Sequence, residues 1–324
     1  MKVYTQVILN RIKELYEEHT WDQIAKILKK EFKLNKSPES IRKAFRRHTK
    51  SDQKRKPSGS NKDQPKILLF DIETAPMLGY VWSLWENNVA LNQLYSDWYV
   101  LSWSAKWLGD PEDKVMYMDQ RNEKNIENDK KILKGIWKLL NEADIVIGQN
   151  SKTFDHKKLN ARFILNGIKP PSSYRHIDTK ILAKRHFSFT SNKLEYMTDK
   201  LCTKFKKLKH AKFSGFSLWR ECLKGNIEAW KEMEEYNKYD VLSLEELYYK
   251  LIPWDNSINF NVYSNSVETI CTCGNKKFKE NGFAYTNSGK FQKYTCTNCG
   301  SELRSKINLL SKDKRKNLKA GTRR

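Results

Sequence analysis

The sequence predicts an α/β domain, preceded by a small helical domain and followed by a small cysteine-containing module. Three observations predict this organisation. Between residues 66 and 255, segments that alternate in polarity are interleaved with segments of helical period. Residues 1–50 show the helical period alone. Four closely paired cysteines lie in the last part of the 324-residue chain.

The charge of the chain is concentrated toward its two ends. The net charge is +23, of which residues 1–65 contribute +9, residues 66–255 +4 and residues 256–324 +10. A balance this basic indicates a polyanionic partner, although charge alone does not name nucleic acid. The hydrophobic fraction of 39%, with 12% aromatic residues, is enough for a packed core and excludes a globally disordered chain.

Membrane and secretory classes are not favoured. No apolar run approaches the roughly 20 residues of a membrane span, and the first 15 residues lack the apolar stretch of a secretory signal. Six cysteines, four of them in two close pairs, are typical of metal binding in a reducing compartment. We therefore expect a cytoplasmic protein.

The helical spacing of apolar residues within residues 1–50 predicts three short helices. The second begins after Thr20, with Gln23 as its capping-box partner, and the third after Ser37, with Pro38 in its first turn. This unit resembles a helix-turn-helix that would bind nucleic acid through the third helix. The basic residues expected there are Arg42, Lys43, Arg46 and Arg47. A small protein-binding module with a solvated basic face is the alternative.

Residues 51–65 are polar and basic, which predicts a flexible linker. The α/β domain then spans residues 66–255. Its strands are expected within 66–73, 98–108, 114–118 and 143–148, and its helices within 125–142, 155–167 and most of 192–252. The insert 76–97, which contains Trp82 and Trp85, fits neither pattern.

Two carboxylates follow the first apolar strand, in the segment ILLFDIET. Asp71 and Glu73 are two residues apart, so a strand would place both on one face and Phe70 and Ile72 on the other. Carboxylates this close repel each other unless a cation neutralises them, and Mg²⁺ prefers oxygen ligands. Alone, the pair fits a solvated strand end better than a metal site.

Two further segments carry similar chemistry. Asn150, Phe154 and Asp155 follow the strand at 143–148 and open a helix, where a helix cap and a core phenylalanine are the simplest interpretations. Tyr236 and Asp240 are four residues apart, which places them on one face of a helix. A charged surface helix is the alternative there.

In this order, the segments DIET, QNSKTFD and YNKYD resemble the motifs of the DEDD (DnaQ-like) superfamily of 3′–5′ exonucleases. The match is to the tyrosine-containing subgroup and to the proofreading domain of family-B DNA polymerases, and it covers residues 66–252. The resemblance implies an RNase H-like mixed sheet flanked by helices. The catalytic residues it implies are Asp71, Glu73, Asp155, Tyr236 and Asp240. Asn150 and Phe154 would contact the terminal nucleotide, and Asp178 would be structural.

The resemblance implies hydrolysis of phosphodiester bonds with two Mg²⁺ or Mn²⁺ ions held by the four carboxylates. Asp71 would bridge the two ions, and Tyr236 would orient the attacking water. We expect nucleotide removal from single-stranded or frayed 3′ ends, with DNA favoured over RNA. An RNase H-like or structure-specific endonuclease and a non-catalytic nucleic-acid-binding regulator are the alternatives. Because no polymerase segment is evident, proofreading would need a separate protein partner.

Residues 256–305 contain the two cysteine pairs, each followed by glycine. The pairs are Cys271 with Cys273 and Cys296 with Cys299. They resemble a zinc ribbon holding one structural Zn²⁺, although the first pair is Cys-x-Cys instead of Cys-x-x-Cys; a redox pair is the alternative. Cys202 and Cys222 are expected in the core.

The segment between the cysteine pairs mixes basic and aromatic residues. They are Lys276, Lys277, Lys279, Lys290 and Lys293, with Phe278, Phe283, Tyr285, Phe291 and Tyr294. A platform for single-stranded nucleic acid and the small core of the ribbon are equally good interpretations. The basic tail 306–324 is expected to lack regular structure.

Overall fold

The computed structural model describes residues 4–16, 19–52, 65–208, 212–319 and 321. The chain forms two compact units, Met1–Lys62 and Asp63–Arg324, and each is described by itself. The linker expected at 51–65 falls almost entirely in residues 53–64, which lie outside the described residues.

The first unit is helical. Its helices are α1 (Gln6–Leu15), α2 (Trp21–Phe32) and α3 (Pro38–Asp52). They enclose a small core in which Ile12, Ile24 and Leu28 are fully buried. The capping box predicted at the start of α2 is confirmed: Gln23 N donates to Thr20 Oγ1, and Thr20 N donates to Gln23 Oε1 over 2.8 Å.

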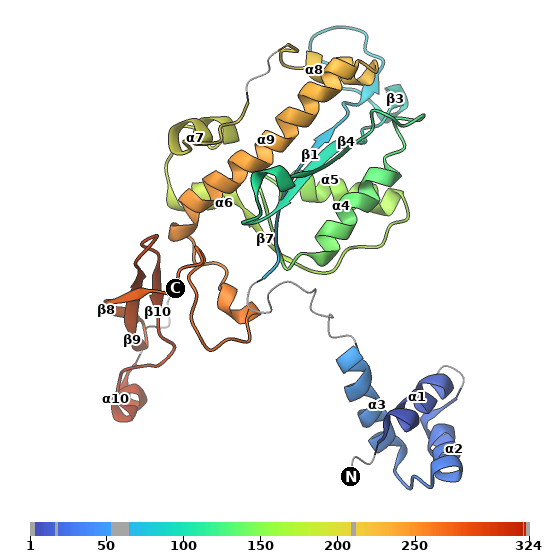
Figure 1. The fold of residues 1–324 in the computed structure, drawn as a ribbon, viewed down its shortest axis with the longest axis vertical. Helices are drawn as coiled ribbons and strands as arrows, with labels where there is room; N and C mark the ends of the chain where they lie inside the picture. The colour runs from blue at the N-terminus through green and yellow to red at the C-terminus, as the bar shows by residue number, and fades with distance from the viewer. Residues whose placement is uncertain (1–3, 17–18, 53–64, 209–211, 320, 322–324) are drawn as a thin grey trace. The chain divides into compact units, whose positions relative to one another are not determined.

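The second unit is built on a mixed five-stranded sheet with the order β5-β4-β1-β6-β7 (Figure 1). The strands are β1 (Ile67–Thr74), β4 (Val100–Trp107), β5 (Met116–Asp119), β6 (Ile145–Gly148) and β7 (Arg175–Asp178). The central strand β1 runs antiparallel to β4 and parallel to β6. This arrangement confirms the predicted α/β fold class.

Helices cover both faces of this sheet. They are α4 (Lys130–Glu142), α5 (Asp155–Leu165), α6 (Thr179–His186), α7 (Leu194–Leu201), α8 (Ser217–Leu223) and α9 (Ile227–Leu251). Alternate residues of β1 enter different cores. Leu68 and Phe70 pack in the core that includes α4 and α5, and Leu69 packs in the core that includes α6, α7 and α9. Asp71 lies on the α9 side, as strand alternation predicts.

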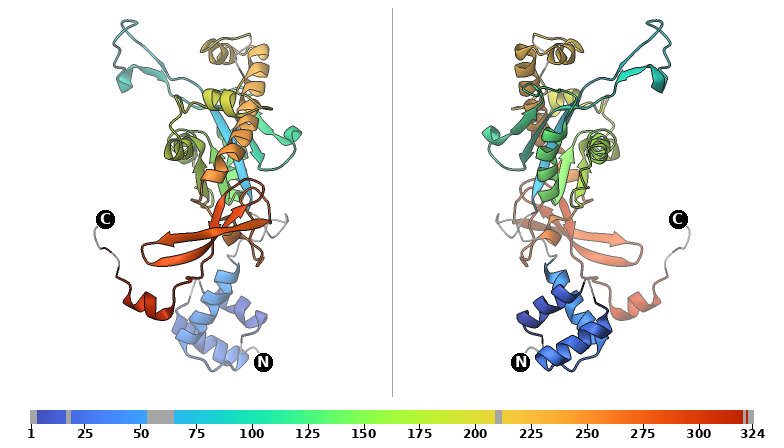
Figure 2. Two further views of the ribbon diagram at one scale, coloured as in Figure 1. Left: turned by 90° about the vertical axis from the view of Figure 1, so that its left-hand side faces the viewer. Right: turned by 90° about the vertical axis from the view of Figure 1, so that its right-hand side faces the viewer.

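The insert 76–97, which sequence patterning left unassigned, forms an arm that projects from the body of the domain (Figure 2). Its elements are β2 (Leu78–Gly79), the 3-10 turn η1 (Leu91–Gln93) and β3 (Leu94–Ser96). Hydrogen bonds in both directions between Tyr80 and Gln93 close it. Its apolar side chains point to solvent: Trp82 is 98% exposed and Trp85 82%.

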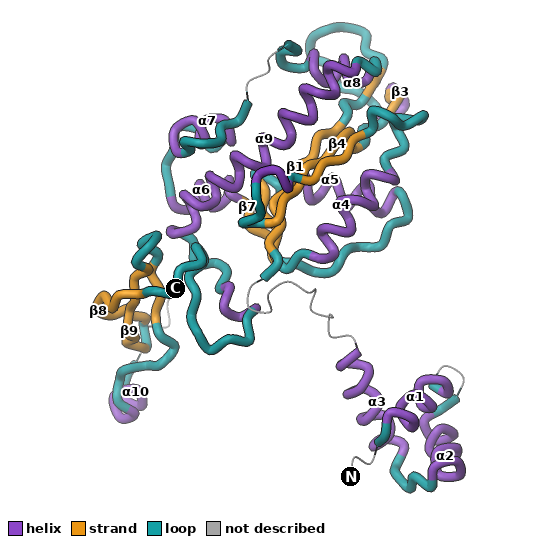
Figure 3. Tube along the Cα trace, viewed as in Figure 1, coloured by secondary structure: helices purple, strands orange, loops and turns teal. Residues whose placement is uncertain are grey.

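The chain after α9 runs through two 3-10 turns, η3 (Ile252–Trp254) and η4 (Phe260–Tyr263), and a loop into a second sheet (Figure 3). That sheet has the order β10-β9-β8, from β8 (Phe278–Thr286), β9 (Gly289–Cys296) and β10 (Glu302–Arg304). The tail is not wholly irregular, contrary to expectation: Lys312–Asn317 forms the short helix α10, capped by Ser311. None of the helices in the described ranges combines the length and apolar character needed to cross a membrane.

Candidate functional site

Three carboxylates from two elements meet beside the central sheet. Asp71 and Glu73 project from β1 toward α9, and Asp240 projects from α9 toward β1. Oxygen atoms of the three side chains all lie within 4.8 Å of one another. We call these residues the acidic cluster. An all-carboxylate donor set at this spacing can hold a hard divalent cation such as Mg²⁺.

Burial and mutual repulsion raise the pKa values in the acidic cluster. Loss of contact with water raises the pKa of Asp71 well above its usual range, and the charges of Asp155 and Asp240 raise it further. The same loss of water, followed by the charge of Asp240, raises the pKa of Glu73 to about 8. The protein alone therefore disfavours three ionised carboxylates here, and a bound cation would relieve the cost.

Asp155 adjoins the acidic cluster through the backbone of β1. It is the first residue of α5 and 3% exposed. Its Oδ1 accepts a hydrogen bond from Ile72 N over 3.1 Å, so this oxygen ties α5 to the strand. Burial raises the pKa of Asp155 to about 7. Asp155 therefore lies against β1 but outside the acidic cluster, with one oxygen committed to the backbone.

Asn237 fixes the orientation of Asp71. Its Nδ2 donates to Asp71 Oδ2 over 2.7 Å, and its Oδ1 accepts from Ser102 Oγ over 3.2 Å. Asn237 is fully buried on α9, and Ser104 Oγ donates to its carbonyl oxygen. Sequence reasoning missed Asn237. Its position between Tyr236 and Asp240 on a helix that proves mostly buried was the available signal.

Lys207 places a positive charge at the acidic cluster. Its Nζ lies 2.8 Å from Asp240 Oδ2 and 4.5 Å from the centroid of the Tyr236 ring. Burial alone would lower the pKa of Lys207, but the charge of Asp240 outweighs it and raises this pKa. One ammonium offsets a single carboxylate, which leaves negative charge for a metal ion. Nothing in the lysine-rich segment around Lys207 singled it out in the sequence.

The hydroxyl of Tyr236 stays protonated at neutral pH. Tyr236 is 8% exposed and lies one helical turn before Asp240. Burial, followed by the negative charge of Asp240, raises the pKa of Tyr236 above its usual value. Its ring meets Trp219 of α8 edge-on, with the centroids 6.2 Å apart. Such a hydroxyl can donate and accept hydrogen bonds, but it is a poor base.

Asn150 and Phe154 lie in the loop that opens α5. Asn150 has a positive φ of 59°, and its N donates to Asp178 Oδ1 over 3.0 Å. Asp178 also accepts from the backbone N of Lys152 and Lys180, so it anchors this loop to the start of α6. Phe154 is 40% exposed and so is not a core residue, contrary to its simplest interpretation from sequence; Lys158 Nζ lies 5.2 Å from its ring centroid.

The basic residues expected on the third helix are only partly described. Arg42 and Lys43 each lie 3.7 Å from Glu39 on the same helix. Their side chains are 40% and 65% exposed. The side chains of Arg46 and Arg47 lie outside the described residues.

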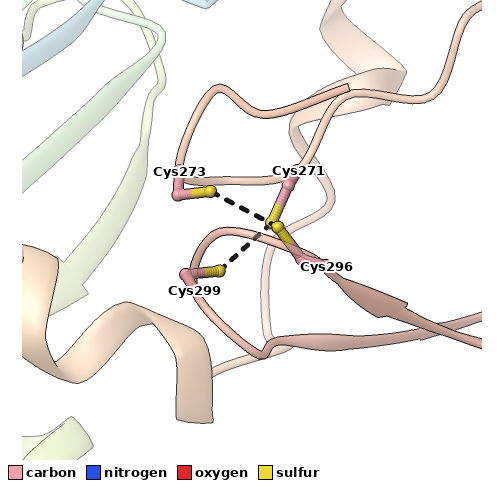
Figure 4. Close-up of side chains that lie close together, drawn as sticks. All are labelled: Cys271, Cys273, Cys296 and Cys299. Carbon is pink, nitrogen blue, oxygen red and sulfur yellow. Dashed lines mark hydrogen bonds between the residues drawn. The ribbon is translucent and has the colours of Figure 1, made fainter. Parts of the chain in front are cut away.

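Four sulfur atoms meet in the C-terminal module (Figure 4). Cys271 Sγ is 3.5 Å from Cys299 Sγ, and Cys273 Sγ is 3.7 Å from Cys296 Sγ. A tetrahedral Zn²⁺ with Zn–S distances near 2.3 Å needs sulfur separations of about 3.8 Å, so the cluster fits zinc closely. Gly274 and Gly300 follow the pairs with φ of 85° and 77°, which the tight turns require.

Polar groups favour the thiolate at Cys296, whereas burial raises the pKa of the Cys271 and Cys299 thiols. Asn275 Nδ2 donates to Cys296 Sγ over 3.2 Å. Burial alone would raise the pKa of the Cys296 thiol, but hydrogen bonds from the backbone of Cys299 and from Asn275 lower it to about 6. The thiolate is the metal-binding form of cysteine. Cys202 and Cys222 are buried elsewhere, as expected.

A comparison with protein families finds a match within the second unit. Residues 107–252 match the model of the RNase H superfamily. The match covers a little under half of the chain and, together with the mixed sheet and its helices, supports an RNase H-like domain, for which nucleic acid is the implied substrate. The matched range includes Asp155 and Asp240 and begins after Asp71 and Glu73.

A solved structure that resembles the chain is the family B DNA polymerase from the hyperthermophilic archaeon Pyrobaculum calidifontis. The sequence identity is 15% and the TM-score 0.43, over 59% of this chain and 25% of the polymerase. The chain therefore spans about a quarter of that protein's length. No curated protein matches the sequence.

Proposed function

We propose that the second unit is a divalent-metal-dependent 3′–5′ exonuclease that removes nucleotides from single-stranded or frayed ends, with DNA as the favoured substrate. The observation that carries the proposal is the convergence of Asp71, Glu73 and Asp240 in an RNase H-like domain. Burial and repulsion raise the pKa values of Asp71 and Glu73, so three ionised carboxylates are costly to keep together without a cation. A metal-binding role explains why the three carboxylates lie together.

The residues present fit two divalent ions. Asp71, Glu73 and Asp240 would hold them, with Asp155 contributing its oxygen that does not bond Ile72 N. When bound, two Mg²⁺ or Mn²⁺ ions would neutralise charge on the phosphate and lower the pKa of the attacking water. Asn237 keeps Asp71 in one orientation for this task.

Four other side chains act on the water or the substrate in this proposal. Tyr236 orients the attacking water through its hydroxyl, because its raised pKa keeps that hydroxyl protonated at neutral pH, where it cannot act as a base. Lys207, whose Nζ now neutralises Asp240, lies where it can meet a phosphate oxygen once metal ions neutralise that carboxylate. Phe154 is exposed beside the site and would stack on the terminal base, with Asn150 in the same loop.

We propose that the four-cysteine cluster binds one structural Zn²⁺. With four thiolates the ion has no open coordination position, so it would shape the module without catalysing a reaction. We also propose that the first unit contacts nucleic acid through α3, where Arg42 and Lys43 add to the +9 charge of residues 1–65.

The test compares the parent protein with Asp71→Asn and a control, Asp113→Asn, on linear and circular single strands with and without Mg²⁺. Asp113 is 75% exposed and far from the acidic cluster in sequence, so its variant should behave as the parent. We expect linear DNA to be digested only with Mg²⁺, circles to survive, and Asp71→Asn to lose at least about a hundredfold in rate. Cleavage of circles would favour an endonuclease. Parental activity in Asp71→Asn would refute the site.

A further inference from the structure

We propose that one face of the β8–β9–β10 sheet binds single-stranded nucleic acid by stacking bases on Phe283 and Tyr285 and contacting phosphate through Lys290. The choice of ligand rests on the proposed nuclease function, because the strand held here is the substrate of that enzyme. The binding site itself is separate from the acidic cluster and from the four cysteines.

The strand register puts these side chains together. β8 and β9 are antiparallel, with Phe283 opposite Gln292 and Tyr285 opposite Lys290. Since side chains alternate along a strand, Phe283, Tyr285 and Lys290 share one face, and Ala284 and Phe291 lie on the other. Residues directly opposite each other have Cβ atoms about 5 Å apart, so Tyr285 and Lys290 are neighbours.

The two rings on this face are not the core of the module. Tyr285 is 71% exposed and Phe283 41%. Phe278, Phe291 and Tyr294 are less exposed, so they provide the packed aromatic residues that sequence reasoning also expected. An exposed pair of rings on a strand that is paired with β9 is a preformed surface, which loses little entropy on binding.

The spacing of the rings favours a single strand over a duplex. Residues i and i+2 of an antiparallel strand are about 6.8 Å apart, whereas successive units of one strand in B-DNA rise about 3.4 Å. Phe283 and Tyr285 therefore match two bases that have been pulled out of their stack. Bases in a duplex remain paired and stacked and cannot reach both rings.

The same face carries the charge that a nucleic acid needs. Lys290 Nζ lies over the Phe283 ring, 3.8 Å from its centroid, so the ammonium is held against this aromatic pair. Residues 256–324 have a net charge of +10. Aromatic rings for bases beside cations for phosphates are the combination typical of single-strand binding.

The arm at 76–97 also exposes aromatic side chains, but it lacks the positive charge of the sheet face. It exposes larger aromatic side chains, with Trp82 at 98%, but its sequence contains no lysine or arginine and includes Glu86 and Asp97. An acidic arm has no group for phosphate, which supplies most of the affinity for nucleic acid. Charge therefore selects the sheet face, and not the arm, as the nucleic-acid surface.

The test measures fluorescence anisotropy of labelled oligothymidylate, oligouridylate and a duplex of about 20 nucleotides, longer than the roughly 4–16 nucleotides that one small module covers. The full-length Asp71→Asn protein is the background, so that hydrolysis does not interfere. Tyr285→Ala should weaken single-strand binding about tenfold, while Tyr285→Phe keeps the parental affinity. Lys290→Ala should weaken binding and reduce its salt dependence. The two single-stranded probes distinguish DNA from RNA.

The matched control is Tyr80→Ala, which removes a 69% exposed tyrosine from the arm and should bind as the parent does. Retained zinc in each variant shows that the module is folded. Unchanged affinity in both Tyr285→Ala and Lys290→Ala overturns the proposal, as does an equal loss in Tyr80→Ala. A protein ligand at this face would produce the first of these results.

The same variants with Asp71 restored separate this proposal from the nuclease. If only the proposed function fails, no Mg²⁺-dependent hydrolysis appears but Tyr285→Ala still weakens binding. If only the binding face fails, Mg²⁺-dependent hydrolysis appears and the affinity of Tyr285→Ala equals that of the parent.

Discussion

Asn237 Nδ2 donates a hydrogen bond of 2.7 Å to Asp71 Oδ2, joining α9 to the central strand across 166 residues of sequence. The bond holds a carboxylate of the acidic cluster in one orientation. It also leaves one oxygen of Asp71 outside this bond and available to a cation. The position of this one carboxylate therefore depends on a neutral side chain that does not itself need to touch a metal or substrate.

Replacing Asn237 tests this positioning role. We expect Asn237→Ala to lower kcat about 10- to 100-fold with a higher Mg²⁺ requirement, because the orientation of Asp71 is lost. Asn87→Ala, in the exposed arm, is the control. The measurement is kcat against Mg²⁺ concentration. A purely structural asparagine would lower stability and leave the Mg²⁺ requirement unchanged.

Lys207 should matter most when metal is absent. Lys207→Ala removes the ion pair with Asp240, and losing one partner of a buried pair costs about 3 kcal/mol. We therefore expect lower resistance to urea without Mg²⁺, and a larger stabilisation by Mg²⁺ than in the parent, because the three carboxylates remain. Lys231→Ala, at an exposed pair on α9, is the control. Equal Mg²⁺ effects in Lys207→Ala and the parent would contradict this account.

The raised pKa values predict how stability depends on pH. Glu73 has a folded pKa of about 8 and an unfolded pKa of about 4.3, so the folded state keeps a proton that the unfolded chain releases between these values. The free energy of unfolding therefore falls as pH rises through this window. Asp71 and Asp155 shift in the same direction.

Thermal unfolding at pH 5.5 and pH 8.5 measures this effect. Without divalent ions, the melting temperature should be lower at the higher pH, and Mg²⁺ should raise it more at pH 8.5 than at pH 5.5. Glu73→Gln should flatten the dependence. A stabilisation by Mg²⁺ that is equal at both pH values would show that these carboxylates are not its site.

The four-cysteine cluster predicts a metal-dependent module. Cys296→Ser should lose the bound zinc and unfold β8–β10, because the metal links both cysteine pairs. Cys202→Ala, buried in the α/β domain, should keep one zinc per chain. Metal analysis and limited proteolysis provide the readouts. A Cys296→Ser protein that retained zinc and protease resistance would rule out the site.

Local chemistry made much of the fold predictable. Thr20 and Gln23 begin α2 because their reciprocal bonds need only neighbouring residues. Asp71 and Glu73 share a face because strands alternate, and Asp240 follows Tyr236 by one helical turn. These short-range rules, together with the family resemblance of three segments, were enough to predict the acidic cluster.

Contacts that depend on distant packing were not predictable. Lys207 contacts Asp240 from a lysine-rich loop. The role of Asn237 depends on its hydrogen bond with Asp71, which is far away in sequence. Hydrophobic periodicity did not predict the structure of the arm, because its aromatic residues, such as Trp82, are exposed instead of buried. In the tail, the cap at Ser311 forms a short helix in a segment whose composition predicted none.

The most direct test of the central claim follows a 5′-labelled single-stranded DNA through time with Mg²⁺. The account predicts a ladder of products that shortens from the 3′ end in single-nucleotide steps, and no products with Asp71→Asn. Products that appear first as internal fragments, or a ladder that Asp71→Asn produces at the parental rate, would contradict it.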